Sequence, residues 1–98
     1  KKSIVKLFTS RGDYPVKSDR ILGWDTPSIN GKSSAGDLFS NQSYGHLGFT
    51  GTSLWIDPVN EIIIVFLTNR VYPTRDRKGI YKVRRDLHNS IMNNILEN

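Results

Sequence analysis

Residues 44–58 read Tyr-Gly-His-Leu-Gly-Phe-Thr-Gly-Thr-Ser-Leu-Trp-Ile-Asp-Pro, and residues 61–69 read Glu-Ile-Ile-Ile-Val-Phe-Leu-Thr-Asn. Between the two apolar runs, Asp57-Pro58-Val59-Asn60 has the chemistry of a tight turn. Proline presets φ at the second turn position, and the Asp and Asn side chains cap the ends. We therefore predict a β-hairpin with strands at residues 45–57 and 61–69.

The second of these strands is apolar at every position from Ile62 to Leu67. Because side chains alternate between the two faces of a sheet, such a run is typical of a strand that is covered on both faces. The sequence therefore predicts a central strand rather than an edge. A small sheet with one helix covers a single face, so the other face requires further layers, from another part of the protein or by self-association.

A helix is predicted from Ile80 onward, because apolar residues recur at spacings of three and four: Ile80, Val83, Leu87, Ile91 and Ile95. This stripe is expected to pack on the sheet, with His88 at its boundary. The polar residues of the helix are expected to face away from the sheet: Lys82, Arg85, Asp86, Asn89 and Asn93.

The N-terminal half is less regular. Residues 3–8 suit the last turns of a helix, and residues 21–24 (Ile-Leu-Gly-Trp) suit a short strand. Residues 25–43 form a long loop rich in Ser, Gly and Asn, a length usual for functional or flexible loops. The predicted fold class is α+β, an antiparallel sheet of two or three strands with a packed C-terminal helix. It occupies residues 1–98 as one incomplete domain.

Composition narrows the possible functions. With 37% hydrophobic and 23% charged residues among 98, the chain has the balance of a globular domain and not of a disordered one. It has no cysteine, and its two histidines, His46 and His88, lie far apart without a carboxylate cluster. The sequence therefore predicts no metal site and no cofactor.

The formal net charge is +5, with Lys and Arg gathered in residues 1–20 and 70–85. These basic residues are not interleaved with aromatic residues in a nucleic-acid-binding pattern, so we expect a solvated surface and no nucleic-acid partner. The longest apolar run, from Ile62 to Leu67, is far shorter than the roughly 18 residues of a membrane span, so no span is expected.

Several features follow one another along the chain: Leu22-Gly23-Trp24-Asp25, a Ser-rich loop, His46-Leu47-Gly48, and a hairpin that ends in Leu67-Thr68-Asn69 before the final helix. This order resembles the C-terminal end of the serine β-lactamase, penicillin-binding protein and esterase superfamily, specifically its class C-like branch. The His46 triplet stands where that family carries its third motif, Lys/His-Thr/Ser-Gly. The resemblance implies a portion of a β-lactamase-like domain whose nucleophile lies elsewhere.

The resemblance also implies roles for individual residues. His46 would orient the substrate carboxylate or the catalytic proton network, and Gly48 would keep the strand flat against bound substrate. The backbone N–H of Phe49 would be one of two oxyanion-hole donors, an effect worth about 10²–10³ in rate. Leu47 would line the substrate site without the hydroxyl group usual there. Together with histidine in place of lysine, this favours an esterase, a peptidase or an unassigned activity over efficient β-lactam hydrolysis.

Other readings of these residues stay open. Tyr44 either lines the mouth of the cleft or simply ends the long loop. His46 could instead be a polar strand residue that bonds a neighbouring loop, although the surrounding glycines at 45, 48 and 51 favour a cleft. Trp24 and Trp55 are expected in the core rather than as substrate platforms.

The family nucleophile sits in a Ser-x-x-Lys motif, followed by a Tyr-x-Asn or Ser-x-Asn motif. Those letters occur here as Ser3-Ile4-Val5-Lys6 and Ser28-Ile29-Asn30. We reject them as the active site, because the chain between them is too short to build the helical domain that buries the serine. The triplets Arg11-Gly12-Asp13 (adhesion) and Asn41-Gln42-Ser43 (glycosylation) are treated as coincidental.

Two functions follow from the sequence. The first is a C-terminal portion of a serine hydrolase that acts on an ester, amide or peptide, supplies one wall of the cleft and is inactive alone. The alternative is a non-catalytic binding or assembly module that keeps the hydrolase shape. The residues do not fix the compartment, and the resemblance suggests a periplasmic or extracytoplasmic protein.

Overall fold

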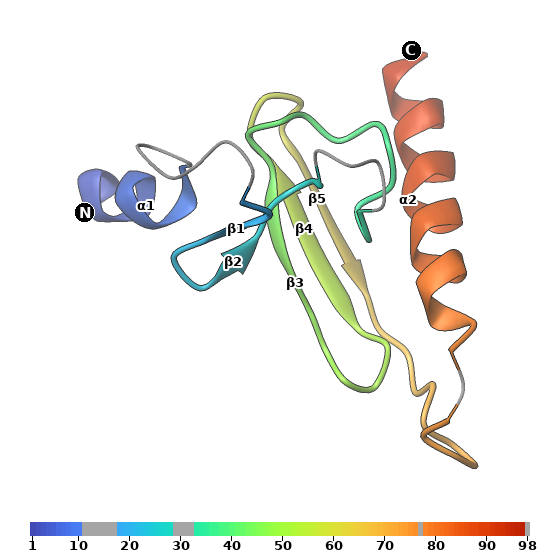
Figure 1. The fold of residues 1–98 in the computed structure, drawn as a ribbon. Coiled ribbons are helices and arrows are strands. Elements are labelled where there is room, and N and C mark those ends of the chain that lie inside the picture. Colours follow the sequence, from blue (N-terminus) through green and yellow to red (C-terminus); the bar gives the residue numbers. More distant parts are fainter. Residues whose placement is uncertain (11–17, 29–32, 77, 98) are drawn as a thin grey trace.

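A computed structural model describes residues 1–10, 18–28, 33–76 and 78–97. It contains a five-stranded antiparallel sheet in the order β1-β2-β3-β4-β5 and two helices (Figure 1). The predicted α+β class is confirmed, with five strands in place of two or three. The elements are α1 (Lys2–Thr9), β1 (Arg20–Ile21), β2 (Trp24–Asp25), β3 (Tyr44–Leu47), β4 (Ser53–Asp57), β5 (Ile62–Phe66) and α2 (Ile80–Leu96).

The additional strands arise where glycine allows the chain to turn. The single strand predicted at residues 45–57 is in fact β3, a turn at 48–52, and β4. Gly51 has φ +98°, a conformation that favours glycine, and its N–H donates to the Gly48 carbonyl at 3.1 Å. Residues 21–24 likewise form a hairpin and not one strand, with Gly23 at φ +79° between β1 and β2.

The turn between β4 and β5 is confirmed, and Asp57 organises it. The carboxylate of Asp57 is fully buried and accepts the backbone N–H groups of Val59 (3.0 Å) and Asn60 (3.1 Å). It also accepts the N–H (2.9 Å) and the hydroxyl (2.7 Å) of Ser40 in the preceding loop. Asp57 therefore fixes both the hairpin turn and the loop that lies beside it.

The pKa of Asp57 reflects these contacts. Burial of the carboxyl group raises the pKa, but the hydrogen bonds from Ser40 and Asn60 outweigh burial and hold the pKa at about 2. Asp57 is therefore a charged and fully satisfied buried group.

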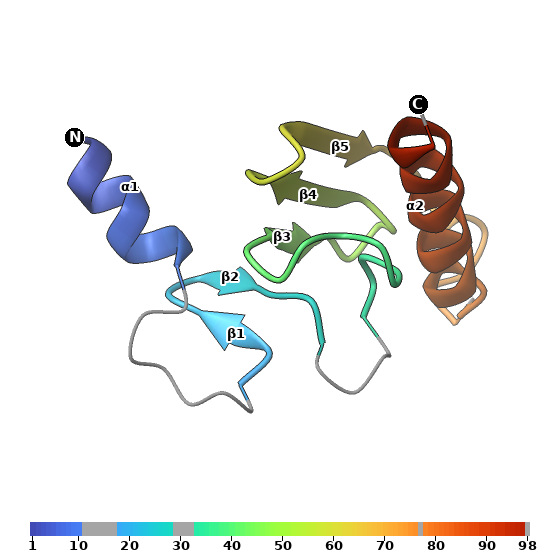
Figure 2. The same cartoon turned by 90° about the horizontal axis from the view of Figure 1, so that it is seen from above.

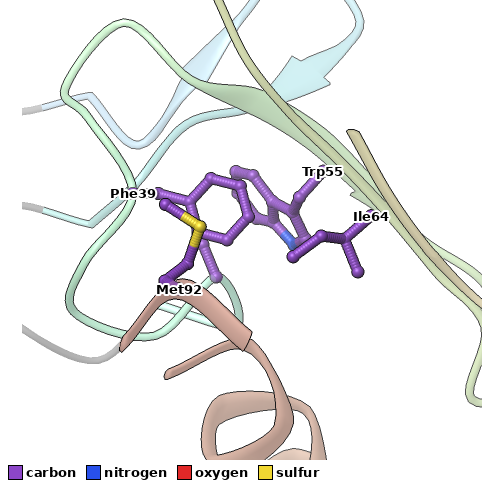
Figure 3. Close-up of a cluster of buried hydrophobic side chains, with 5 residues drawn as sticks. Phe39, Trp55, Ile64 and Met92 are labelled. Atoms are coloured by element: carbon purple, nitrogen blue, oxygen red, sulfur yellow. The ribbon is translucent and has the colours of Figure 1, made fainter. Parts of the chain in front are cut away.

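The hydrophobic core lies between one face of the sheet and α2 (Figure 2). Trp55 of β4 and Ile64 of β5 point toward Met92 of α2, and Phe39 of the 33–43 loop fills the space between them (Figure 3). Ala35 completes this cluster. The burial of Trp55 confirms its predicted place in the core, whereas Trp24 is only half-buried and stacks edge-on against Tyr44.

The buried face of α2 differs from the predicted stripe. The residues that are buried follow a spacing of four: Ile80, Arg84, His88 and Met92. Val83 and Ile95 are exposed instead, and His88, predicted at a boundary, is fully buried. Two polar side chains turn inward because backbone carbonyls accept their hydrogen bonds: His88 bonds to Ser34 of the 33–43 loop, and Arg84 bonds to the turn at residues 48–52.

Contacts with that loop also correct two expectations about the outer face of α2. Arg85 donates to the Ser33 carbonyl at 2.7 Å and pairs with Asp37 at 2.8 Å, so it does not simply face solvent. The Asn89 side chain accepts the Asp37 N–H at 2.7 Å. The basic residues at 70–85 were expected to form a solvated surface. Arg85 instead makes structural contacts with the 33–43 loop.

The predicted central position of β5 is wrong for the part of the chain that the structure describes, since β5 forms one edge of the sheet. Ile63 is 67% exposed, and Val65 and Leu67 are exposed as well, because α2 covers only the opposite face. Helix α1 lies well apart from α2, on the other side of the sheet (Figures 1 and 2). None of the residues of α1 is buried.

Within the described ranges, neither helix has the length and apolar character needed to cross a membrane.

Candidate functional site

The residues singled out by sequence lie on β3 and on the turn that follows it. In the antiparallel register, Gly45 pairs with Trp55 and His46 with Leu54. Because strand side chains alternate, Tyr44 and His46 share the open face of the sheet, whereas Leu47 lies on the face toward α2. A Cβ at Gly45 would collide with the Trp55 ring, so this glycine is required by the core.

His46 has an exposed side chain whose Nδ1 lies 2.7 Å from the Leu47 carbonyl oxygen. A carbonyl oxygen can only accept, so Nδ1 carries the hydrogen and donates it. The neutral ring then has an unprotonated Nε2, which can accept a hydrogen bond or a proton. The acceptor is the next residue of β3 and not the neighbouring loop that the sequence raised as an alternative, and the contact leaves Nε2 able to accept.

The turn at residues 48–52 carries Phe49, whose ring is 58% exposed. The Gly48 N–H donates to the Thr52 carbonyl at 2.8 Å, and a Cβ at Gly48 would collide with the Thr52 hydroxyl. The requirement for glycine therefore has a local cause within the turn. Among the described residues, no acceptor is found for the Phe49 N–H, the group expected to act as an oxyanion donor.

Arg84 of α2 reaches the turn from the covered face of the sheet. Its Nε donates to the Gly51 carbonyl at 3.1 Å, and its Nη2 donates to the carbonyls of Gly48 and Thr52, each at 3.1 Å. Arg84 is only 3% exposed, and no carboxylate in the described ranges forms an ion pair with it. Burial, together with the positive charge of Arg70, lowers the pKa of Arg84.

Arg70 holds the exposed side of the same turn. Its Nε donates to the Phe49 carbonyl at 2.8 Å, and its backbone N–H donates to the Thr50 carbonyl at 2.8 Å. The guanidinium carbons of Arg70 and Arg75 lie 4.8 and 5.1 Å from the centre of the Phe49 ring, within cation–π range. Every carbonyl from Gly48 to Thr52 thus has a hydrogen-bond donor, and the turn is rigidly held.

Two cavities flank β3 without enclosing His46. The larger, about 730 Å³, is lined by Tyr44 and by the α1 residues Lys2 and Lys6. The smaller, about 340 Å³, lies on the α2 face and is lined by Leu47. Tyr44 and Leu47, both predicted to bind substrate, therefore line different cavities. A cleft that encloses His46 would need residues from a part of the protein that the structure does not describe.

Sequence reasoning missed Arg70 and Arg84, the two residues that hold the turn. Arg84 follows Ile80 by four positions and precedes His88 by four, a spacing that could have indicated a common helix face. Ser3, rejected as a nucleophile, is exposed on α1. The triplets at 11–13 and 28–30 fall wholly or partly outside the described residues. No cluster of three potential metal ligands occurs in the described ranges.

The fold and the glycine-rich β3–β4 hairpin define part of a β-lactamase-like α+β domain. The Beta-lactamase family model matches residues 8–89, so the chain belongs to the Beta-lactamase family. A protein of Salmonella gallinarum named "Putative D-alanyl-D-alanine carboxypeptidase" is 53% identical to it over 70 residues. A protein of Escherichia coli K12 with the same name is 43% identical over 72 residues.

Each of these matches covers 67% of this chain and only 15% of the relative. The chain thus corresponds to a small part of the curated relatives that it matches. No solved structure matches it significantly.

Proposed function

We propose that this chain forms one wall of the active-site cleft in a serine hydrolase of the β-lactamase, penicillin-binding protein and esterase type. Membership of the Beta-lactamase family supports the class of protein. The names of the relatives support a hydrolase of peptide or related acyl substrates. Because the match spans 15% of those relatives, the nucleophile belongs to another part of the complete protein.

The observation that carries the proposal is the β3–β4 turn, which holds the Phe49 N–H next to the strand that bears His46. When a serine hydroxyl attacks a substrate carbonyl, negative charge develops on the carbonyl oxygen. The Phe49 N–H donates to that oxygen, and a fixed donor needs no reorganisation during the reaction. His46, through Nε2, accepts a hydrogen bond or a proton in the same cleft.

The remaining predicted residues refine the substrate class. Gly48 ends the strand at a turn that leaves no room for a side chain, and Tyr44 lies on the same face as His46. Leu47 points to the opposite face and carries no hydroxyl group, so it cannot bind a substrate carboxylate. This favours ester or peptide hydrolysis over β-lactam hydrolysis.

The test is hydrolysis of a nitrophenyl ester and of a peptide ending in D-Ala-D-Ala by the complete protein. His46→Ala is expected to lower kcat/KM by about 10²-fold, the usual contribution of a positioned acid or base. Lys82→Ala, a change on the exposed face of α2, serves as the control and should leave kcat/KM unchanged. The 98-residue chain alone should show no turnover, because it lacks the nucleophile.

An inactive complete protein would contradict the proposal and favour the alternative, a non-catalytic module that associates through the exposed residues Ile63 and Val65. Turnover by the isolated chain that disappears in Ser3→Ala would also contradict it, since it would place the nucleophile in α1.

A further inference from the structure

We propose that Arg84 is a positioning residue that fixes the Phe49 N–H and strengthens it as a hydrogen-bond donor. The inference rests on the proposed function of the Phe49 N–H. Arg84 would not touch the substrate, because it approaches the turn from the α2 side of the sheet.

The argument begins with the peptide bond between Gly48 and Phe49. The Gly48 carbonyl and the Phe49 N–H are the two ends of one planar, conjugated group. The Gly48 oxygen accepts a hydrogen bond from Arg84 Nη2 at 3.1 Å and a second from the Gly51 N–H at 3.1 Å. A cationic donor at the oxygen end polarises the whole group, so the N–H at the other end becomes a stronger donor.

The geometry also restricts the orientation of that N–H. Arg84 uses two nitrogens of one rigid guanidinium plane to bond Gly48, Gly51 and Thr52 together. A planar fork fixes the relative orientation of its acceptors, which a lysine ammonium group on a flexible stem cannot do. The turn therefore has little freedom to rotate the Phe49 peptide away from a bound substrate.

Structural need alone does not account for an arginine here. The carbonyls of Gly48 and Thr52 already accept backbone N–H groups, from Gly51 and Gly48 respectively. Only the Gly51 carbonyl depends on Arg84 among the described donors. A buried cation without a carboxylate partner carries a desolvation cost, which an apolar residue between Ile80 and His88 would avoid.

Arg85 provides a matched comparison. It is the next residue of α2 and also donates to a backbone carbonyl, that of Ser33, but it contacts the 33–43 loop and not the turn. If arginines on α2 mattered only because they attach the helix, replacing either one would have similar consequences.

The experiment uses the complete protein with Arg84→Met, Arg84→Lys and, as the control, Arg85→Gln. Steady-state kinetics give kcat and KM for a nitrophenyl ester. Infrared difference spectroscopy of the acyl-enzyme gives the stretching frequency of the acyl carbonyl, which rises when oxyanion-hole donors weaken. If Arg84 only attached α2 to the sheet, its replacement would not move this band.

We expect Arg84→Met to lower kcat by about 10-fold, less than the effect of deleting an oxyanion donor outright, with KM nearly unchanged and the carbonyl band shifted upward. Arg84→Lys keeps the charge but not the fork, and should lower kcat to an intermediate degree. Arg85→Gln should leave kcat and the band as in the unmodified protein.

Unchanged kcat and an unchanged band in either folded Arg84 variant would overturn this inference while the proposed function stands. Should Arg84→Met not fold, Arg84→Lys decides the question by the same two measurements. A complete protein that forms no acyl-enzyme at all would instead overturn the proposed function, and the inference with it.

Discussion

The two faces of the sheet carry alternate residues of the same strands and differ in how far their side chains are buried. On the covered face, Trp55 and Ile64 pack against Met92 and Phe39. On the open face, His46 and Leu54 lie opposite one another, and Ile63 and Val65 of β5 are exposed. The comparison separates two tasks: one face holds the fold together, and the other carries the candidate site.

The difference also explains how the site is supported. The turn at residues 48–52 joins β3 to β4 and is held by Arg84 from the covered face. Rigid packing behind the sheet thereby fixes a backbone donor whose proposed ligand lies in front of it. A site built on packed elements retains its geometry better than one carried by a free loop.

The largest expected effect compares neighbours in β5. Ile64→Ala removes a side chain that is 7% exposed and should lower the free energy of unfolding by about 3 kcal/mol, as usual for a truncated core isoleucine. Ile63→Ala makes the same chemical change on the open face and should cost less than about 1 kcal/mol. Urea denaturation of the 98-residue chain measures both.

Equal losses for the two variants would contradict the comparison. They would mean that Ile63 is covered, either by a second copy or by chain outside the described residues. Repeating the pair at several protein concentrations separates these cases, because only association makes the stability depend on concentration.

The second prediction concerns Asp57, whose hydrogen bonds join the 33–43 loop on the covered side to the turn between β4 and β5. Its folded pKa of about 2 lies below the ordinary value of 3.8. The carboxylate therefore contributes stability above pH 3.8, and the contribution is lost as the pH falls toward 2. The shift corresponds to about 2 kcal/mol, and thermal unfolding between pH 5 and pH 2 should show it.

Asp57→Asn is the matched control, because it has nearly the same shape and no charge. Its amide group cannot accept all the N–H groups that surround it, so it should be less stable by about 2 kcal/mol at neutral pH. Its acid limb should be flatter than that of the unmodified protein. An equally steep acid limb in Asp57→Asn would assign the pH dependence to other carboxyl groups.

Much of the fold could be predicted because it depends on local signals. The helix beginning at Ile80, the Asp57–Asn60 turn and the burial of Trp55 follow from periodicity, turn chemistry and residue type. The division of residues 45–57 into two strands was missed, since a strand-like pattern masked the turn that Gly48 and Gly51 permit.

The rest depends on contacts between distant residues. Apolar periodicity selected Val83 for the core, but Arg84 and His88 turn inward because backbone carbonyls of Gly48 and Ser34 accept their hydrogen bonds. In the site, the roles of His46 and Phe49 came from a family resemblance. The resemblance did not indicate Arg70 and Arg84, the two arginines that hold the turn. They lie outside the strand that carries the motif and belong to no motif themselves.

The smallest expected effect tests the polar part of the covered face. His88 is fully buried, its Nδ1 donates to the Ser34 carbonyl at 2.7 Å, and its ring lies edge-on to Phe39 at 5.8 Å. Burial lowers the pKa of His88, the hydrogen bond with Ser34 opposes that shift, and the charge of Arg84 lowers the pKa further. The neutral ring is therefore the form that the fold accommodates.

The unfolded chain takes up a proton near pH 6.5, where folded His88 stays neutral, so its contribution to stability is present above pH 6.5 and declines as the pH falls below it. The loss between pH 8 and pH 6 should be at most about 0.8 kcal/mol, measured from urea midpoints. His88→Gln, which keeps a donor for Ser34 and cannot be protonated, should remove this slope. A slope that persists in His88→Gln would assign the pH dependence to other groups and contradict the expectation that burial of His88 makes its proton affinity differ between the folded and unfolded chain.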